Sequence, residues 1–195
     1  SGNAAWDTHF ADTLHGLIRT LDRPGLKGWV LDLRGNQGGN CWPMLAGIGP
    51  VLGNGVCGYF GAGEDRSHWS YGEGRSSMDD TVQCAISRSP YTLHAPDPRV
   101  AVLTGPATAS SGEVVAVAFR GRHGARSFGS ATAGYSTSNT NFELSDGAML
   151  FLATSVYVDR ALNPYGGAVP PDEVVPKSAE GDATLDRAVQ WLRGE

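Results

Sequence analysis

Twice in this sequence an apolar run leads directly into a turn of small residues, and this pattern limits the fold more than any other feature. Residues 28–34 (GWVLDLR) predict a mostly buried strand that enters the glycine-rich turn of residues 35–39. Residues 99–104 (RVAVLT) predict a second buried strand, which enters the turn of residues 105–109 and then a helix over 110–120. A strand that continues through a turn into a helix is the repeating unit of α/β domains.

The rest of the chain adds helices and β-hairpins to these two units. An apolar arc at helical spacing predicts a helix over residues 6–21, and Asp182 is a suitable N-cap for a closing helix that ends near Arg193. We also expect a helix over 42–52, strands over 56–60 and 125–129, a hairpin over 141–157 that turns at 145–147, and a surface excursion or hairpin over 61–80. No repeat or linker divides the chain, so the sequence predicts one α/β domain around a partly parallel sheet.

Composition excludes several classes of protein. The chain has 195 residues, of which 41% are hydrophobic and 18% charged, as is typical of one globular domain. The net charge is -5 and no run of Lys or Arg occurs, which argues against a nucleic-acid partner. No apolar stretch reaches the roughly 20 residues that a membrane span needs. The cysteines (Cys41, Cys57 and Cys84) lack the spacing of a zinc site or a disulfide framework. We therefore expect no metal, and buried free thiols, although Cys57 and Cys84 could pair in an oxidising compartment.

Both turns have a composition that could serve catalysis, because backbone N–H groups and helix dipoles converge where strands end and helices begin. Gly38 and Gly39 allow the backbone to approach a substrate and to direct an N–H at an oxygen. Ser110 stands at a predicted helix start, where the N–H of Ser111 could donate to a developing oxyanion. The same residues also have a structural interpretation, since Ser110 and Glu113 have the spacing of a capping box. The glycine pair could likewise be only a tight turn.

Taken in order, four segments of the chain resemble the C-terminal-processing serine peptidases, the tail-specific and tricorn-like family. The matching segments are residues 32–39 (DLRGNQGG), 108–113 (TASSGE), 129–134 (GSATAG) and, more loosely, 168–172 (AVPPD). They are spread over nearly the whole chain. The resemblance implies a crotonase-like and Clp-protease-like fold, a twisted sheet with flanking helices. It also implies hydrolysis of peptide bonds in peptides or proteins through an acyl-enzyme, without a cofactor.

The resemblance assigns catalytic roles to residues of both turns. The nucleophile falls on Ser110, and one oxyanion donor falls on the N–H of Ser111. The second donor is the N–H of Gly38 or of Gly39. A purely structural role, bracing the glycine turn, is the expectation for the charged residues Asp32 and Arg34 at the end of the first strand.

The chain departs from the family where many members carry a base lysine. Tyr135 stands at that position, just after the GSATAG segment, and the only lysines, Lys27 and Lys177, lie elsewhere. A Ser–Lys dyad is therefore excluded by the inventory of residues. Tyr135 and Asn139, on the following segment, are candidates to contact the substrate.

The sequence names no clear base for the serine. The histidines are His9, His15, His68, His94 and His123, and none has the spacing of a metal ligand pair. The first two flank the apolar arc of the first helix, where a solvated helix edge is the plain interpretation. Within the chain, His68 is the candidate base. The tricorn-like branch uses a histidine upstream of this region, so we expect the base to precede the first helix.

The chain begins with Ser1-Gly2-Asn3-Ala4 and has no initiating Met. We therefore expect residues 1–195 to be the core domain of a longer peptidase whose upstream segment is absent. Most members of the family are exported, so we expect a periplasmic or extracellular protein, and a cytoplasmic location stays open.

Two alternatives to a peptidase stay open. One is a non-catalytic binding module of the same fold, for a small hydrophobic ligand or a peptide, and the other is an acyl-CoA enzyme. Substrate preference and oligomeric state do not follow from the sequence.

Overall fold

Parallel strands form the sheet that the two strand-to-turn units predict. In a computed structural model that describes residues 4–62 and 65–195, the strand order is β1-β6-β7-β10, and each strand runs parallel to its neighbour. The strands are β1 (Trp29–Asp32), β6 (Val100–Thr104), β7 (Ala125–Gly129) and β10 (Glu173–Val174). Every residue of β6 is buried, as expected for a central strand that is covered on both faces. β1 lies at an edge of the sheet, so its residues alternate between half-buried and exposed, and the expectation of a mostly buried strand was wrong there.

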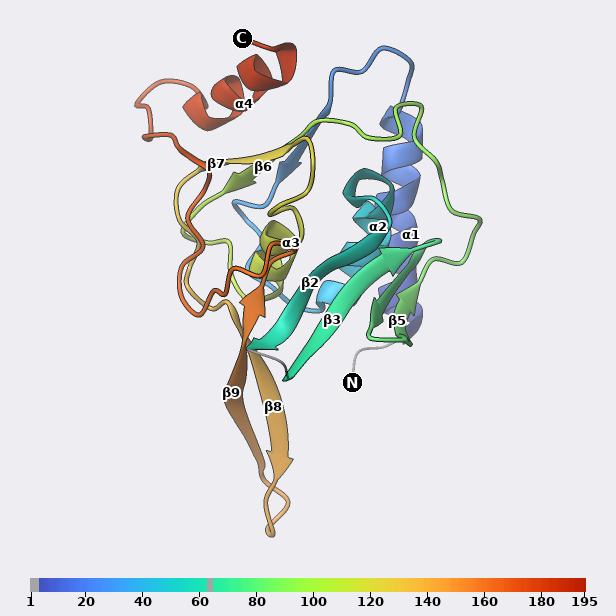
Figure 1. Cartoon of the computed structure of the whole chain (residues 1–195), viewed down its shortest axis with the longest axis vertical. Coiled ribbons are helices and arrows are strands. Elements are labelled where there is room, and N and C mark those ends of the chain that lie inside the picture. The colour runs from blue at the N-terminus through green and yellow to red at the C-terminus, as the bar shows by residue number, and fades with distance from the viewer. Residues whose placement is uncertain (1–3, 63–64) are drawn as a thin grey trace.

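A second sheet is antiparallel, with the order β5-β4-β3-β2-β9-β8. Its strands are β2 (Gly55–Ala62), β3 (Asp65–Gly72), β4 (Arg75–Met78), β5 (Thr81–Ala85), β8 (Thr137–Glu143) and β9 (Met149–Val158). The hairpin predicted over 141–157 is confirmed as β8 and β9, and it projects from the body of the molecule (Figure 1). Its first strand begins earlier than predicted, at Thr137.

Of the two forms expected for residues 61–80, a surface excursion or a hairpin, the described residues form a hairpin of β3 and β4, and part of it is buried. Trp69 and Tyr71 of β3 are buried in the main core. The residues between them and beside them are Ser, His and Gly, which hide the alternation of a half-buried strand in the sequence. Residues 63 and 64 of this segment lie outside the described residues.

The predicted helices are confirmed, with small shifts at their ends. They are α1 (Ala4–Leu21), α2 (Cys41–Leu52), α3 (Ser111–Ala118) and α4 (Ala183–Arg193). Asp182 caps α4 as predicted, because its side chain accepts the N–H of Leu185 at 3.1 Å.

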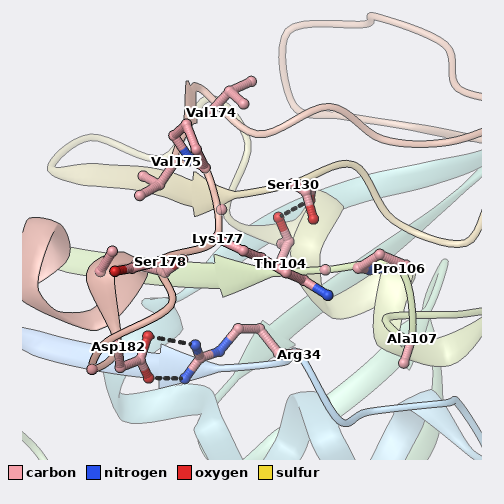
Figure 2. A pocket seen from close by; sticks show the side chains of 16 residues that line it. Arg34, Thr104, Pro106, Ala107, Ser130, Val174, Val175, Lys177, Ser178 and Asp182 are labelled. Atoms are coloured by element: carbon pink, nitrogen blue, oxygen red, sulfur yellow. Dashed lines mark hydrogen bonds and ion pairs between the residues drawn. The ribbon is translucent and has the colours of Figure 1, made fainter.

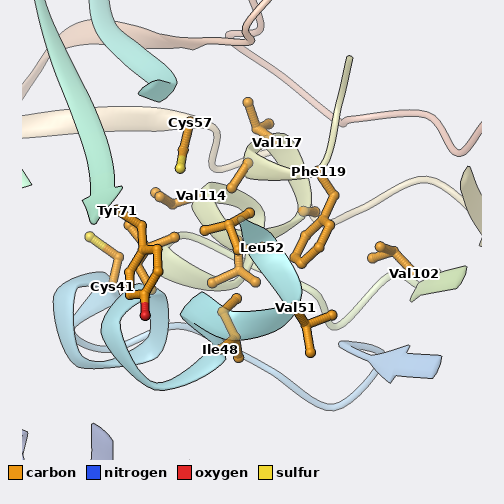
Figure 3. Packing of buried hydrophobic residues seen from close by; sticks show 14 of the residues in the cluster. Cys41, Ile48, Val51, Leu52, Cys57, Tyr71, Val102, Val114, Val117 and Phe119 are labelled. Atoms are coloured by element: carbon orange, nitrogen blue, oxygen red, sulfur yellow. The ribbon is translucent and has the colours of Figure 1, made fainter. Parts of the chain in front are cut away.

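The two faces of the parallel sheet pack against different helices. Val100 and Val102 of β6 belong to the main core, which α2 and α3 fill between the two sheets (Figure 3). Ala101 and Leu103 point the opposite way and form a smaller core with α4. This alternation along one strand produces the layer order α4, parallel sheet, helices, antiparallel sheet. The result is the mixed α/β architecture that the sequence predicts.

The cysteines are all buried and unpaired, so the expectation of free thiols is confirmed. Burial raises the pKa of Cys41 to about 12 and that of Cys57 to about 11. Both thiols are therefore protonated and weakly nucleophilic at neutral pH.

A substitution at Gly49 of α2 tests how closely the helical layer packs against the antiparallel sheet. A Cβ at this position would lie 1.8 Å from the ring of Tyr71, so the helix or the ring would have to move. We expect Gly49→Ala to lower the free energy of unfolding by about 1–3 kcal/mol. Gly16 of α1 is the matched control, because nothing lies within 4 Å of its added Cβ. Gly16→Ala should raise the free energy of unfolding by up to about 1 kcal/mol. Denaturant unfolding measures both, and equal effects would contradict this packing.

His15 is buried, with 4% of its surface exposed, so the expectation of a solvated helix edge was wrong. Its Nε2 accepts the N–H of Tyr91 at 2.8 Å, and this nitrogen must therefore be unprotonated in the folded protein. Burial lowers the pKa of His15 below its ordinary value of 6.5, and the charge of Arg19 adds to the effect. The folded protein therefore favours the neutral imidazole of His15.

This buried imidazole predicts a pH dependence of stability. The unfolded chain binds a proton at this histidine more readily than the folded chain does, so the free energy of unfolding falls as pH falls through about 6.5 and below. His15→Gln should flatten the pH dependence in that range. Denaturant unfolding at about pH 7 and about pH 5 measures the difference. An unchanged pH dependence in His15→Gln would contradict the assignment.

Candidate active site

Ser110 lies at the junction of the two turns in a conformation that is rare for a residue with a side chain. It directly precedes α3, with a φ of 51° and a ψ of -118°. Such positive φ values outside glycine cost energy and gather at functional sites. Gly38 of the first turn packs against it, since a Cβ added there would lie 3.0 Å from the Ser110 Cβ. Glycine at position 38 therefore allows the two turns to touch.

The capping box forms, so the structural interpretation of Ser110 and Glu113 holds alongside the catalytic one. The Ser110 N–H donates to the Glu113 carboxylate at 2.8 Å, and the Glu113 N–H donates to the Ser110 carbonyl at 2.7 Å. These bonds fix the backbone of the serine on both sides. The residue is half-buried at the N-cap of α3.

Glu113 joins the serine turn to the other segments of the family pattern. Its carboxylate is fully buried and accepts three hydrogen bonds. One oxygen accepts the Ser110 N–H, and the other accepts the Thr132 hydroxyl at 2.5 Å and the Gly134 N–H at 3.0 Å. Thr132 in turn accepts the N–H of Val169 at 2.8 Å. Three donors compensate the burial of one carboxylate. Through Thr132 the network joins three parts of the chain: the serine turn, residues 132–134 and Val169.

The predicted oxyanion donors all lie beside Ser110, but their N–H groups differ in what they bind. The Gly38 N–H already donates to the Asn36 side chain at 3.0 Å. Within residues 4–62 and 65–195, the N–H groups of Gly39 and Ser111 have no hydrogen-bond acceptor. The two residues are joined through the Ser111 hydroxyl, which donates to the Gly39 carbonyl at 2.6 Å. This geometry leaves two backbone donors available next to the serine.

The remaining predicted site residues lie farther out. Tyr135 is 66% exposed and follows Gly134, whose N–H binds Glu113. Asn139 is exposed on β8, where it pairs with Ala153. Among the described residues, no hydrogen bond or ion pair joins either of them to Ser110.

His68 lies on β3, on the face opposite Trp69 and Tyr71. Its ring Nδ1 is 3.2 Å from the Asp79 carboxylate, which also accepts the His68 N–H at 2.9 Å. The part of the chain that the structure describes shows no contact between His68 and Ser110.

Tyr157 is a residue of this site that sequence reasoning missed. It is 4% exposed, and its phenol lies near the Ser110 side chain. Burial raises the pKa of the phenol, as do the neighbouring Cys41 and Glu113, while Ser110 opposes this rise. Position 157 belongs to a strand that ends a long hairpin, and nothing in that pattern pointed to the serine turn.

Asp32 and Arg34 do pair with each other, and Arg34 also reaches α4. The guanidinium binds Asp32 at 2.9 Å and both oxygens of Asp182 at 2.8 Å. The hydrogen bonds from Arg34 lower the pKa of Asp32. The end of β1 is thereby tied to the start of α4.

A pocket of about 750 Å³ opens at the carboxyl ends of β6 and β7, beside the turn that carries Ser110 (Figure 2). Its walls come from that turn at Pro106 and Ala107 and from the segment between β10 and α4. Arg34 and Asp182 neutralise each other at its floor. Lys177 is its one lining charge without an ion pair among the described residues.

Two negative findings concern the described residues alone. Within 4–62 and 65–195, no group of His, Cys, Asp and Glu side chains has the arrangement of a metal site. Over the same residues, no helix has both the length and the apolar character for crossing a bilayer.

The buried carboxylate of Glu113 makes a direct prediction. Glu113→Gln replaces one carboxylate oxygen by an amide NH2 group, which donates hydrogen bonds and does not accept them. This group would face a donor of Ser110, Thr132 or Gly134, so at least one buried hydrogen bond is lost. We expect the free energy of unfolding to fall by about 2 kcal/mol. Glu143→Gln, on the exposed part of β8, is the matched control and should change stability little. Denaturant unfolding compares the two, and equal stability of both variants would contradict the role given to Glu113.

The comparisons with known proteins agree with this geometry. A family model described as peptidase family S41 matches residues 4–175. The nisin-resistance protein of Lactococcus lactis subsp. lactis is 29% identical over 194 residues, which are 97% of this chain and 57% of that protein.

Solved structures share the fold. A lipoprotein from Streptococcus agalactiae is 28% identical, with a TM-score of 0.77 over 100% of this chain and 63% of that chain. A photosystem II D1 C-terminal processing protease is 21% identical, with a TM-score of 0.58 over 97% of this chain and 44% of its own. The predicted fold class is thereby confirmed. The chain spans less than two thirds of the length of each of these relatives.

Proposed function

The chain belongs to peptidase family S41, and on this basis we propose that it is the core of a serine endopeptidase with Ser110 as its nucleophile. The observation that carries the proposal is the strained backbone of Ser110, held between the glycine turn and α3 by Glu113. Strain of this kind persists only where the surrounding structure enforces it. A serine that served only as a helix cap would not need it.

In this mechanism the Ser110 hydroxyl attacks the carbonyl carbon of the scissile peptide bond and its proton passes to a general base. The oxyanion that forms is stabilised by the N–H groups of Ser111 and Gly39, which have no acceptor in the described part of the chain. Gly38 serves as the point of contact with Ser110, because its own N–H binds Asn36. The protonated base gives its proton to the leaving amine, and an acyl-enzyme remains. Water, deprotonated by the same base, then hydrolyses the ester, which releases the carboxylic acid and returns the proton to Ser110.

We assign the general base to a segment outside this chain. His68 faces Asp79 across the outer face of the antiparallel sheet, and the phenol of Tyr157 stays protonated because burial raises its pKa. The relatives extend well beyond the region that this chain matches, so they have residues that could supply a base. Residues 1–195 then form a core domain that depends on its parent protein for activity.

The substrate that suits this site is a peptide or protein. The pocket beside the turn has a size suited to a few side chains, and Lys177 gives it a positive charge that favours an acidic group. Tyr135 and Asn139 are exposed on the segment that follows Gly134, and we propose that they contact the extended substrate. Relatives described as a nisin-resistance protein and as a lipoprotein support an exported location.

A non-catalytic binding module of the same fold is the second candidate. It is favoured by the lack of a base within reach of Ser110 among the described residues. The two functions differ in one chemical property, the nucleophilicity of Ser110.

Labelling with a fluorophosphonate probe distinguishes these functions. The probe is applied to this chain and to the parent protein with the residues that precede Ser1, and mass spectrometry locates the adduct. We expect an adduct on Ser110 in the longer form and its loss in Ser110→Ala. Ser89→Ala, at an exposed position outside this pocket, is the matched control and should label normally. Labelling of the short chain as well would place the base within it. An absence of labelling in both forms would contradict the peptidase and leave the binding module.

A further inference from the structure

The Ser111 hydroxyl links the two turns at the point where each turn offers a backbone donor. Ser111 is the first residue of α3, and its N–H has no acceptor among the described residues. Its buried hydroxyl donates to the Gly39 carbonyl at 2.6 Å. In the proposed mechanism Ser111 thus supplies one oxyanion donor through its backbone and binds, through its side chain, the residue that supplies the other.

Asn36 holds the glycine turn from its other side. Its side-chain oxygen accepts the Gly38 N–H at 3.0 Å, and its amide group donates to the Met44 sulfur at 3.5 Å. Its backbone carbonyl accepts the Ala109 N–H at 3.0 Å. A Cβ at Gly112 of α3 would lie 2.5 Å from that carbonyl oxygen, so the helix packs directly on this residue. Asn36 is therefore fixed by both turns and by α3.

These hydrogen bonds matter because the backbone of the glycine turn is not stiff by itself. Gly38 and Gly39 have φ values of 112° and 119°, in a region that glycine enters freely. The peptide group that joins them is held on both sides, since the Gly38 N–H binds Asn36 and the Gly39 carbonyl binds Ser111. The Gly39 N–H, which lies between these two bonds, has no acceptor in the described part of the chain.

We infer that the Ser111 hydroxyl and the Asn36 side chain are positioning groups, which hold the Gly39 N–H at a fixed distance from the Ser111 N–H. The inference rests on the proposed function. Two donors stabilise one oxyanion well only if both nitrogens lie about 3 Å from the same point. Because both side chains order the turn before a substrate binds, the donors need no rearrangement during attack. In this role neither side chain exchanges a proton with the substrate.

The first test removes the hydroxyl and leaves the N–H of residue 111 in place. Fluorophosphonate labelling of Ser110 is followed in the form of the protein that reacts. We expect Ser111→Ala to lower the maximal labelling rate about tenfold or more. The probe concentration at half-maximal rate should change little, because the donors act on the charge that develops during attack. The midpoint of the pH profile should stay the same, since the base is untouched.

Ser76→Ala is the matched control. Ser76 is fully buried on β4, and its hydroxyl also donates to a backbone carbonyl, that of Trp42, at 2.8 Å. We expect this variant to lose stability as Ser111→Ala does and to label at the normal rate. Equal maximal rates for Ser111→Ala and the unchanged protein would overturn the inference. An equal loss of rate in Ser76→Ala would also overturn it, because lost stability alone would then explain the effect.

The second test needs no activity and separates this inference from the proposed function. Nitrogen-15 relaxation measures the order parameter of the Gly39 N–H, which we expect to be about 0.85, the value of rigid backbone. It should fall below about 0.6 in Ser111→Ala and in Asn36→Ala, and stay unchanged in Ser76→Ala. An unchanged value in the first two variants would overturn the inference even in a protein that labels. If the unchanged protein does not label, the peptidase proposal fails, and this measurement still decides whether the two side chains hold the turn.

Discussion

The buried carboxylate of Glu113 is the interaction on which the rest of the site depends. A fully buried anion is stable only if donors surround it, and here they come from the serine turn, from Thr132 and from Gly134. The donors belong to two stretches of backbone, the serine turn and residues 132–134. Satisfying one charge therefore holds these two stretches together beside Ser110.

The layered fold explains why these stretches can meet. The turns after β1, β6 and β7 all leave the same edge of the parallel sheet, because parallel strands end on one side. The antiparallel sheet closes over α2 and α3 from the other side and brings β9 against α3. At the start of α3, Ser110 has the backbone N–H groups of Gly39 and Ser111 beside it. The pocket with Lys177 opens along the same edge.

Much of the fold could be predicted from the sequence because its units are local. The strand-to-turn patterns and the helix periodicity identified β1, β6 and the helices, and family resemblance joined Ser110 to the glycine pair. The parts that could not be predicted depend on distant contacts. β10 is two residues long, and its pairing with β7 leaves no pattern in the sequence. His15 and Tyr157 are defined by what packs on them, and the spacing of neighbouring residues does not contain that information.

The choice between Gly38 and Gly39 shows the same limit. Both residues fit a turn that directs an N–H at an oxygen, and only the side chain of Asn36 distinguishes them, by binding one of the two. The base is a further case, since among the described residues no histidine is hydrogen-bonded to Ser110.

We propose Ser110 as a nucleophile whose tetrahedral intermediate is bound by the backbone N–H groups of Ser111 and Gly39. The sharpest test is a crystal structure of the protein inactivated by a phosphonate. We expect phosphorus bonded to the Ser110 Oγ, with one phosphonyl oxygen about 3 Å from the nitrogens of both Ser111 and Gly39. An adduct on another residue, or a phosphonyl oxygen directed into solvent, would contradict it.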